Sequence, residues 1–166
     1  MKNGERTKLE KASRIKIMDC LPKYYSDFKQ LNEEWIKAYF ILEDADKRAL
    51  DDPEGYILSK GGKILCAIEG ESVLGVCALM KMEDNNFDYE LAKMAVSPAA
   101  QGKGIGYQLG LAVIEKAKSL GATNLFLESN TKLKPALSLY HKLGFQKIEG
   151  YSSPYERSNI QMVITF

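Results

Sequence analysis

The sequence predicts a mixed α/β (α+β) domain built on one central, mostly antiparallel sheet of six to seven strands flanked by helices. Three observations predict this fold. Short alternating or apolar runs, typical of strands, occur along the whole chain. Three of these runs follow one another with only short turns between them, which is typical of an antiparallel meander. Later, helical segments alternate with strands, which predicts a β-α-β crossover between parallel strands.

The first third of the chain is predicted to be mostly helical after one short strand. Alternation in IKIM predicts a strand over residues 15–18. From Pro22, apolar residues recur at three- and four-residue spacing, which predicts a helix with a buried stripe. The stripe consists of Phe28, Leu31, Trp35, Ala38, Tyr39 and Leu42. A second, short helix is predicted over 44–50, and the Asp-Pro-Glu-Gly stretch at 52–55 ends it.

The remaining elements complete the sheet. Gly121 and Gly144 mark the ends of two predicted helices, because glycine commonly follows the last helical turn. The crossover should place the strands around Met94 and Phe126 next to each other and parallel. The predicted strands are 63–69, 73–82, 87–96, 125–127, 145–149 and 160–166, and the predicted helices are 103–120 and 135–143.

Length and composition limit the functional classes. The 166 residues, without repeats or linkers, predict a flexible tail over 1–13 and one domain over 14–166. The net charge of +1 does not suggest a nucleic-acid partner. No apolar run approaches the ~20 residues of a membrane span, so no membrane partner is expected. The three cysteines contain no CxxC pair, which argues against disulfides and a metal site. With no signal peptide apparent, we expect a cytoplasmic location.

The stretch AAQGKGIG, between a predicted strand and a predicted helix, is the main functional signal. Glycines let the backbone approach a ligand closely, and a helix N-terminus presents unpaired N–H groups, so an anion is the expected ligand. The spacing fits neither a dinucleotide fingerprint, which needs a third glycine, nor a P-loop, because Lys103 is followed by Gly104. A glycine-rich turn without a ligand is the plain structural alternative.

Two separated motifs resemble one family. ELAKMAVSPAAQGKGIGYQLGLAVIEKAKSLGA, followed by PALSLYHKLGF, is similar to the acetyl-CoA-binding core of the GCN5-related N-acetyltransferases. The likeness is direct over 89–145, and the order of elements from Ile15 to Phe166 also matches that fold. The resemblance implies a GNAT-like sheet whose β-α-β unit binds the coenzyme. It also implies acetyl-CoA as cosubstrate and an acyltransferase that needs no metal.

The resemblance also implies which residues contact acetyl-CoA. Backbone amides of one loop would bind the pyrophosphate; its residues are Gln101, Gly102, Lys103, Gly104, Ile105 and Gly106. The strand that contains Met94, Ala95 and Val96 would pair with the pantetheine arm. A bulge in this strand would turn an N–H toward the thioester. Leu133 stands where many members have a coenzyme-binding asparagine, and Asn130 is the nearest amide that could replace it.

Two residues are catalytic candidates by the same resemblance. Tyr140 matches the tyrosine that protonates the departing thiolate, a role that suits a phenol because it stays neutral at working pH. A core tyrosine is the alternative. Glu90 stands where some members carry the base that deprotonates the amine, with a surface carboxylate as the alternative and Asp88 and Glu128 as further candidates.

We therefore predict an acetyl-CoA-dependent N-acetyltransferase that transfers the acetyl group directly to a primary amine in a ternary complex. A small-molecule acceptor is favoured because aromatic residues are concentrated where the family binds the amine, with Tyr24, Tyr25 and Phe40 as pocket candidates. Arg157 could pair with a substrate carboxylate, with a solvated loop arginine as the alternative. The alternatives are a protein lysine or N-terminal acetyltransferase and a non-catalytic acetyl-CoA-sensing module. The sequence leaves open whether the chain acts as a homodimer.

Overall fold

The computed structural model describes residues 14–166, which form one seven-stranded sheet in the order β1-β2-β3-β4-β5-β7-β6. Only β4 and β5 are parallel, and every other neighbouring pair is antiparallel. The predicted mixed, mostly antiparallel sheet is therefore confirmed. The predicted tail over 1–13 lies outside the described residues.

The N-terminal elements follow the predicted order with shifted boundaries. Strand β1 (Ile15–Asp19) leads into the 3₁₀ turn η1 (Pro22–Tyr24) and helix α2 (Tyr25–Tyr39). The buried positions of α2 are Phe28, Asn32 and Ile36, so the stripe is rotated from the predicted one, and Tyr39 is 53% exposed. Helix α3 (Asp44–Asp51) is followed by a π-helical turn, η2 (Glu54–Leu58), where the sequence predicted only a break.

The meander and the crossover occupy the predicted positions. Strands β2 (Lys63–Glu69), β3 (Ser72–Lys81) and β4 (Tyr89–Val96) form the meander, and the short 3₁₀ turn η3 (Pro98–Ala100) follows β4. Helix α4 (Ile105–Ser119) then crosses over to β5 (Asn124–Ser129). The last elements are α5 (Lys134–Leu143), β6 (Gln146–Ile148) and β7 (Ile160–Thr165).

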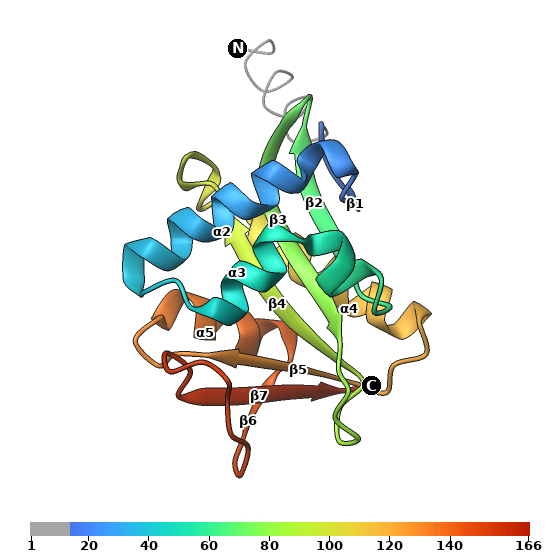
Figure 1. Cartoon of the computed structure of the whole chain (residues 1–166), viewed down its shortest axis with the longest axis vertical. Helices are drawn as coiled ribbons and strands as arrows, with labels where there is room; N and C mark the ends of the chain where they lie inside the picture. The colour runs from blue at the N-terminus through green and yellow to red at the C-terminus, as the bar shows by residue number, and fades with distance from the viewer. Residues whose placement is uncertain (1–13) are drawn as a thin grey trace, which may run out of the picture.

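Each face of the sheet is covered by its own apolar cluster. In Figure 1, α2 and α3 lie in front of the sheet and α4 lies behind it. The front cluster includes Phe28, Ile36 and Ile57, and the rear cluster includes Leu109, Leu125 and Phe145. Cys20, Cys66 and Cys77 are buried as free thiols, and burial raises the pKa of Cys77, so they act as small apolar residues.

The sheet opens between its two parallel strands. The pairing of β4 with β5 consists of Tyr89 with Leu125 and Glu90 with Phe126, and it does not continue beyond Glu90. Figure 1 shows the two strands meeting near the C-terminus and then diverging. The strands around Met94 and Phe126 are adjacent and parallel, as predicted, with Glu90 as the residue paired to Phe126. The free edges of β4 and β5 create the opening in which the functional residues lie.

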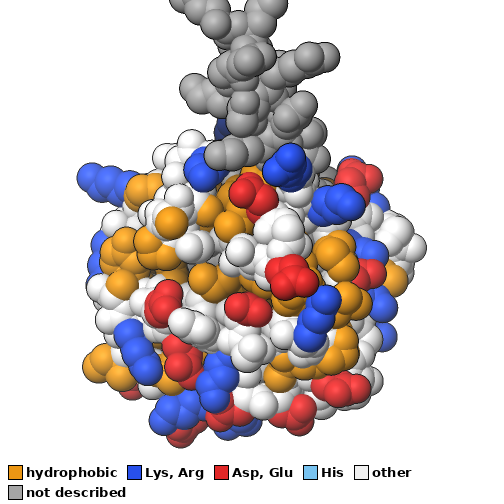
Figure 2. All heavy atoms as spheres, turned by 90° about the horizontal axis from the view of Figure 1, so that it is seen from above, with side chains coloured by type: hydrophobic (Ala, Val, Ile, Leu, Met, Phe, Trp, Pro, Cys, Tyr) orange, Lys and Arg blue, Asp and Glu red, His pale blue; other side chains and the backbone are white. Residues whose placement is uncertain are grey.

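The surface agrees with the near-neutral net charge. Figure 2 shows acidic and basic side chains intermixed on the face it views, with hydrophobic side chains between them. Within residues 14–166, no helix has the length and apolar character needed to cross a bilayer.

Candidate functional site

A cavity of about 100 Å³ lies in the opening between β4 and β5. Strand β4 contributes residues 90–94, and β5 contributes Glu128 and Ser129. Tyr140 of α5 lines the same cavity, so the structure brings both catalytic candidates, Glu90 and Tyr140, to one space. Helix α2 closes the cavity with Asn32, Trp35 and Ile36.

Strand β4 carries a β-bulge in the wall of this cavity. Val76 of β3 pairs with Ala95, and Ala78 pairs with Ala92, so one residue of β3 faces two residues of β4, Lys93 and Met94. Lys93 has a φ of 52°, in the left-handed region that bulky residues rarely adopt. The bulge bends β4 and turns its backbone where the strand has lost its β5 partner. Met94 lines the cavity, whereas Ala95 is buried in the front apolar cluster.

The glycine-rich loop leads directly into α4. Gly102 has a φ of 80° and Gly104 a φ of 75°, and a Cβ atom at either position would meet no other atom within 4 Å. Gly104 is the N-cap of α4 and provides no side-chain cap, so the N–H groups of the first helical turn are free of intrahelical partners. Gln101 and Lys103 are exposed. The loop therefore has the shape and polarity of an anion-binding turn.

The carboxylates of Glu90 and Glu128 influence each other across the opening. Burial, together with the negative charge of Glu128, raises the pKa of Glu90 to about 8, although Lys93 opposes this rise. Burial also raises the pKa of Glu128, against hydrogen bonds from Ser153 and Gln161. Asp88, the other candidate base, accepts hydrogen bonds from the N–H and hydroxyl of Thr123, and its pKa is lowered. Glu90 is therefore the group whose pKa suits a base near neutral pH.

Tyr140 has the environment of a proton donor. Burial raises the pKa of its phenol above the usual value, so the hydroxyl keeps its proton at neutral pH. Its ring packs edge-on against Phe145, with the centroids 6.2 Å apart. This contact holds the Tyr140 ring, which projects from α5, in the wall of the cavity.

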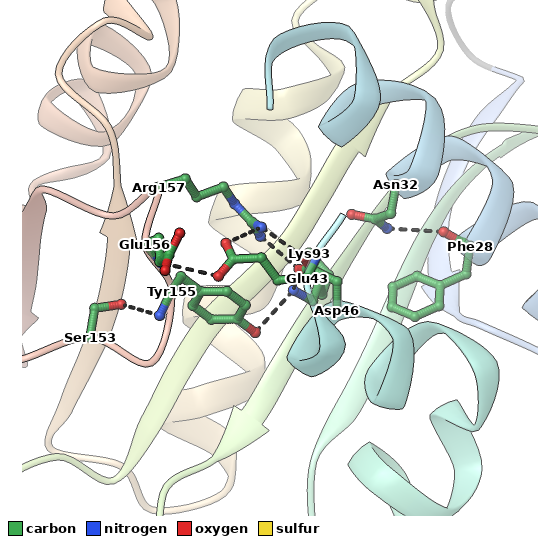
Figure 3. A network of polar contacts seen from close by, with 9 residues as sticks. All are labelled: Phe28, Asn32, Glu43, Asp46, Lys93, Ser153, Tyr155, Glu156 and Arg157. Carbon is green, nitrogen blue, oxygen red and sulfur yellow. Dashed lines mark hydrogen bonds and ion pairs between the residues drawn. The ribbon is translucent and has the colours of Figure 1, made fainter. Parts of the chain in front are cut away.

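A buried ionic network lies beside the bulge (Figure 3). Asp46 of α3 is fully buried and accepts hydrogen bonds from Lys93 Nζ at 2.5 Å and from both terminal nitrogens of Arg157 at 2.6 Å. Burial alone would raise the pKa of Asp46, but Arg157 and Lys93 outweigh it and lower that pKa to about 2. Arg157 is thus held by a carboxylate of this chain, which corrects its predicted pairing with a substrate carboxylate.

Asn130 lies at the end of β5 and lines the cavity beside Leu133. Its Nδ2 donates to the backbone oxygen of Arg157 at 2.7 Å, and its Oδ1 accepts from the N–H of Lys132 at 3.0 Å. Asn130 therefore connects β5 to the loop before β7. One N–H of its amide group remains for a further acceptor.

A second cavity, of about 250 Å³, reaches the same carboxylates from another side. Glu90, Glu128 and Tyr155 line both cavities. The walls of the second cavity are largely aromatic: Phe87 stacks on Phe126 with centroids 4.8 Å apart, and Tyr151 packs on Phe87 at 5.0 Å. Tyr151 is 37% exposed, so this cavity opens to the surface.

The comparisons with known proteins agree on the family. A sequence profile described as the acetyltransferase (GNAT) family matches residues 22–145. The chain belongs to the GNAT family. The acetyltransferase is 35% identical over 118 residues to the N-acetyltransferase YvbK of Bacillus subtilis, covering 71% of each chain. It is 38% identical over 82 residues to the N-acetyltransferase YjgM of Escherichia coli, covering 49% of this chain and 48% of that protein. Both relatives are described as uncharacterised.

Solved structures show the same fold. A GNAT-family acetyltransferase from Staphylococcus aureus superposes with a TM-score of 0.81 at 22% identity, covering 91% of this chain and 98% of that one. YncA of Salmonella typhimurium, solved with its cofactor acetyl-CoA, superposes with a TM-score of 0.74 at 19% identity, covering 91% and 93%. Family membership makes this protein an acyltransferase that uses acetyl-CoA, as the sequence predicted.

The residues present fit acetyl-CoA. The open space at Gly102 and Gly104 allows a phosphate to approach the backbone, and the first turn of α4 faces it with free N–H groups. The hydroxyl of Ser158, which lines the first cavity, is buried without a hydrogen-bond partner among the described residues, so a polar ligand would satisfy it. Within residues 14–166, no group of three potential metal ligands is found.

Sequence reasoning missed three residues of the site and misplaced two others. Lys93 and Asp46 were not assigned to the site, because their contact joins residues 47 positions apart. Asn32 is buried on the apolar stripe of α2 and donates to the Phe28 carbonyl; its polar character among apolar neighbours was the available signal. Tyr24 and Tyr25 were expected in a pocket, but Tyr24 is buried in the front apolar cluster and Tyr25 packs against it, whereas Phe40 does line the first cavity.

Proposed function

We propose that this acetyltransferase transfers the acetyl group directly from acetyl-CoA to a primary amine of a small molecule in a ternary complex. The observation that carries the proposal is the meeting of two cavities at Glu90 and Glu128. One cavity continues from the opening between the strands, and the other opens to the surface through an aromatic wall. Two substrates can thus approach one reacting centre from different sides, with no covalent enzyme intermediate.

On the donor side, the backbone of 101–106 holds the pyrophosphate, aided by the positive end of the α4 dipole. The free edge of Met94, Ala95 and Val96 pairs with the extended pantetheine arm as an added strand would. An N–H at the bulge polarises the thioester carbonyl. The remaining N–H of Asn130 contributes a further hydrogen bond to the coenzyme.

The chemistry needs one proton acceptor and one proton donor. The acceptor amine arrives as an ammonium, whose usual pKa is about 10.4, and loses a proton to Glu90. The amine nitrogen then attacks the carbonyl carbon, the C–N bond forms and the C–S bond breaks. Tyr140 gives its proton to the departing sulfur, and the second proton of the attacking nitrogen restores the Tyr140 phenol. The products are an acetamide and coenzyme A thiol, and the proton held by Glu90 passes to solvent.

The second cavity indicates the acceptor class. Its lining includes the carboxylates of Glu90 and Glu128, which attract an ammonium, and the rings of Phe87, Phe126 and Tyr151, which favour an apolar or aromatic body. Arg48 and Asp84 also line it. A small primary amine with an apolar group fits this combination better than a polycation.

Replacing Glu90 tests the base. Because the pKa of Glu90 is raised to about 8, the carboxylate form is present only as the pH rises toward that value. We therefore expect kcat/KM to rise with pH along an ascending limb that ends near pH 8. We expect Glu90→Gln to lower the rate about 10²-fold and to remove this limb. Asp88→Asn is the matched control, since its carboxylate lies outside both cavities. A limb that survives in Glu90→Gln would assign the base to another group.

Replacing Tyr140 tests the acid. Tyr140→Phe removes the hydroxyl but keeps the ring contact with Phe145. We expect the single-turnover rate to fall about 10²-fold while the Kd for acetyl-CoA changes less than threefold. Tyr39→Phe, at an exposed position of α2, serves as the control. An unchanged single-turnover rate would exclude Tyr140 as the proton donor.

Measuring coenzyme A thiol release across an amine panel tests the acceptor class. The panel contains phenylalkylamines, amino acids, polyamines, aminoglycosides and lysine peptides. We expect the highest kcat/KM for the small apolar amines, and a roughly tenfold loss for these in Tyr151→Ala, because this exposed ring forms part of the cavity wall. Preference for lysine peptides would favour the protein acetyltransferase, and binding of acetyl-CoA without thiol release from any amine would favour the sensing module.

A further inference from the structure

Lys93 has a backbone conformation that costs free energy. Among residues 14–166, it is the single non-glycine residue with a positive φ. Such a conformation places Cβ close to the neighbouring carbonyl oxygen, so it persists only where surrounding contacts hold it. The chain places this strained residue at the bulge of β4, in the wall of the first cavity.

The contacts that hold Lys93 come from its own side chain. Only 5% of the side chain is exposed, so the ammonium requires partners inside the protein. Nζ lies 2.5 Å from Asp46 Oδ1 and 3.2 Å from the hydroxyl of Tyr155, and 4.7 Å from the centre of the Tyr155 ring. Figure 3 shows the Tyr155 hydroxyl directed toward Lys93. Burial lowers the pKa of Lys93, against the opposing effect of Asp46.

The same network extends to both sides of the reacting centre. Asp46 belongs to α3; it accepts two hydrogen bonds from Arg157, in the loop between β6 and β7, and one from the N–H of Glu43. Glu43, at the N-cap of α3, accepts from Arg157 and from the N–H of Glu156. Helix α3 and this loop border the second cavity through Arg48 and Tyr155, whereas the bulge borders the first. The ionic contacts therefore link the walls of the two cavities.

We propose that Lys93 is a positioning residue for acetyl transfer, whose ion pair with Asp46 fixes the bulge facing the acetyl group and holds the β6–β7 loop over the acceptor cavity. The inference rests on the proposed function for the identity of the two cavities. In this role Lys93 touches neither substrate; it acts through the β4 backbone and through Tyr155. The alternative is a purely structural anchor that contributes stability alone.

Lys93 also affects the charge balance at Glu90. Lys93 from the same strand, Glu128 from β5 and Tyr155 from the β6–β7 loop interact electrostatically with Glu90. The other charged or titratable residues that line its two cavities are Arg48, Tyr56, Asp84, Tyr140, Tyr151 and Arg157. The Lys93 ammonium favours the ionised form of Glu90. Removing this charge raises the pKa of Glu90, so the limb of kcat/KM moves to higher pH. The limb therefore reports the charge of Lys93, whereas the affinity ratio of acetyl-CoA to coenzyme A separates a positioning residue from a purely structural anchor.

Three variants separate these effects. Lys93→Gly removes the ammonium but allows the positive φ without strain. Lys93→Met removes the charge and retains a long apolar side chain. Lys93→Arg retains the charge and serves as the conservative variant. Each is compared with wild type for its folded state by circular dichroism, for the pH profile of kcat/KM, and for the affinity ratio of acetyl-CoA to coenzyme A.

The affinity ratio tests the bulge without any acceptor. A lost hydrogen bond to the acetyl carbonyl reduces the preference for acetyl-CoA over coenzyme A about fivefold. We expect this loss in Lys93→Met, which keeps the strained φ but lacks the ion pair, and a smaller loss in Lys93→Gly, which removes the strain as well. Both variants move the limb of kcat/KM to higher pH, and Lys93→Arg restores both readouts. A folded Lys93→Met with an unchanged affinity ratio would overturn the proposal, whatever the position of its limb. If the wild-type protein releases no coenzyme A thiol with any amine, the proposed function fails. The affinity ratio of acetyl-CoA to coenzyme A still decides the role of Lys93, because it needs no acceptor.

Discussion

The end of pairing between β4 and β5 is the constraint on which the rest of the site depends. Two parallel strands share only two residue pairs and then separate inside the protein, so the backbone of β4 beyond Glu90 loses its partner on that side. Buried backbone groups need hydrogen bonds, and an extended ligand can provide them. In the function that we propose, this ligand is the pantetheine arm of acetyl-CoA. The opening of the sheet is therefore the proposed donor site.

Residues around the opening are placed by different elements, each for a local reason. The glycine loop starts α4 with free N–H groups, α5 delivers Tyr140, and β4 delivers Glu90 at its last residue paired to β5. Burial of Glu90 beside this opening, together with the negative charge of Glu128, raises the pKa of Glu90 to about 8. Asp46 then ties the bulge to the acceptor side. The opening between β4 and β5 therefore underlies the proposed donor binding, proton transfer and acceptor access.

Much of the fold and half of the site can be read from the sequence, because they depend on local patterns. Strand β2 begins and ends at the predicted residues, and glycines mark the ends of α4 and α5. The motifs led to Glu90 and Tyr140, which line one cavity. The stripe of α2 was misassigned because aromatic residues at helical spacing occur on both its faces, as the exposed Tyr39 shows. Lys93, Asp46 and Arg157 come together only in the folded chain, so local patterns contain no signal for their network.

Residue-resolved amide hydrogen exchange, with and without acetyl-CoA, tests the central claim most directly. In the proposed complex, the coenzyme lies along the free edge of β4 and at the first turn of α4. We expect acetyl-CoA to slow amide exchange at 94–96 and 105–107 and to leave it unchanged in β1, which lies at the far edge of the sheet. Unchanged exchange along β4, with protection appearing elsewhere, would contradict the claim that the opening of the sheet is the donor site.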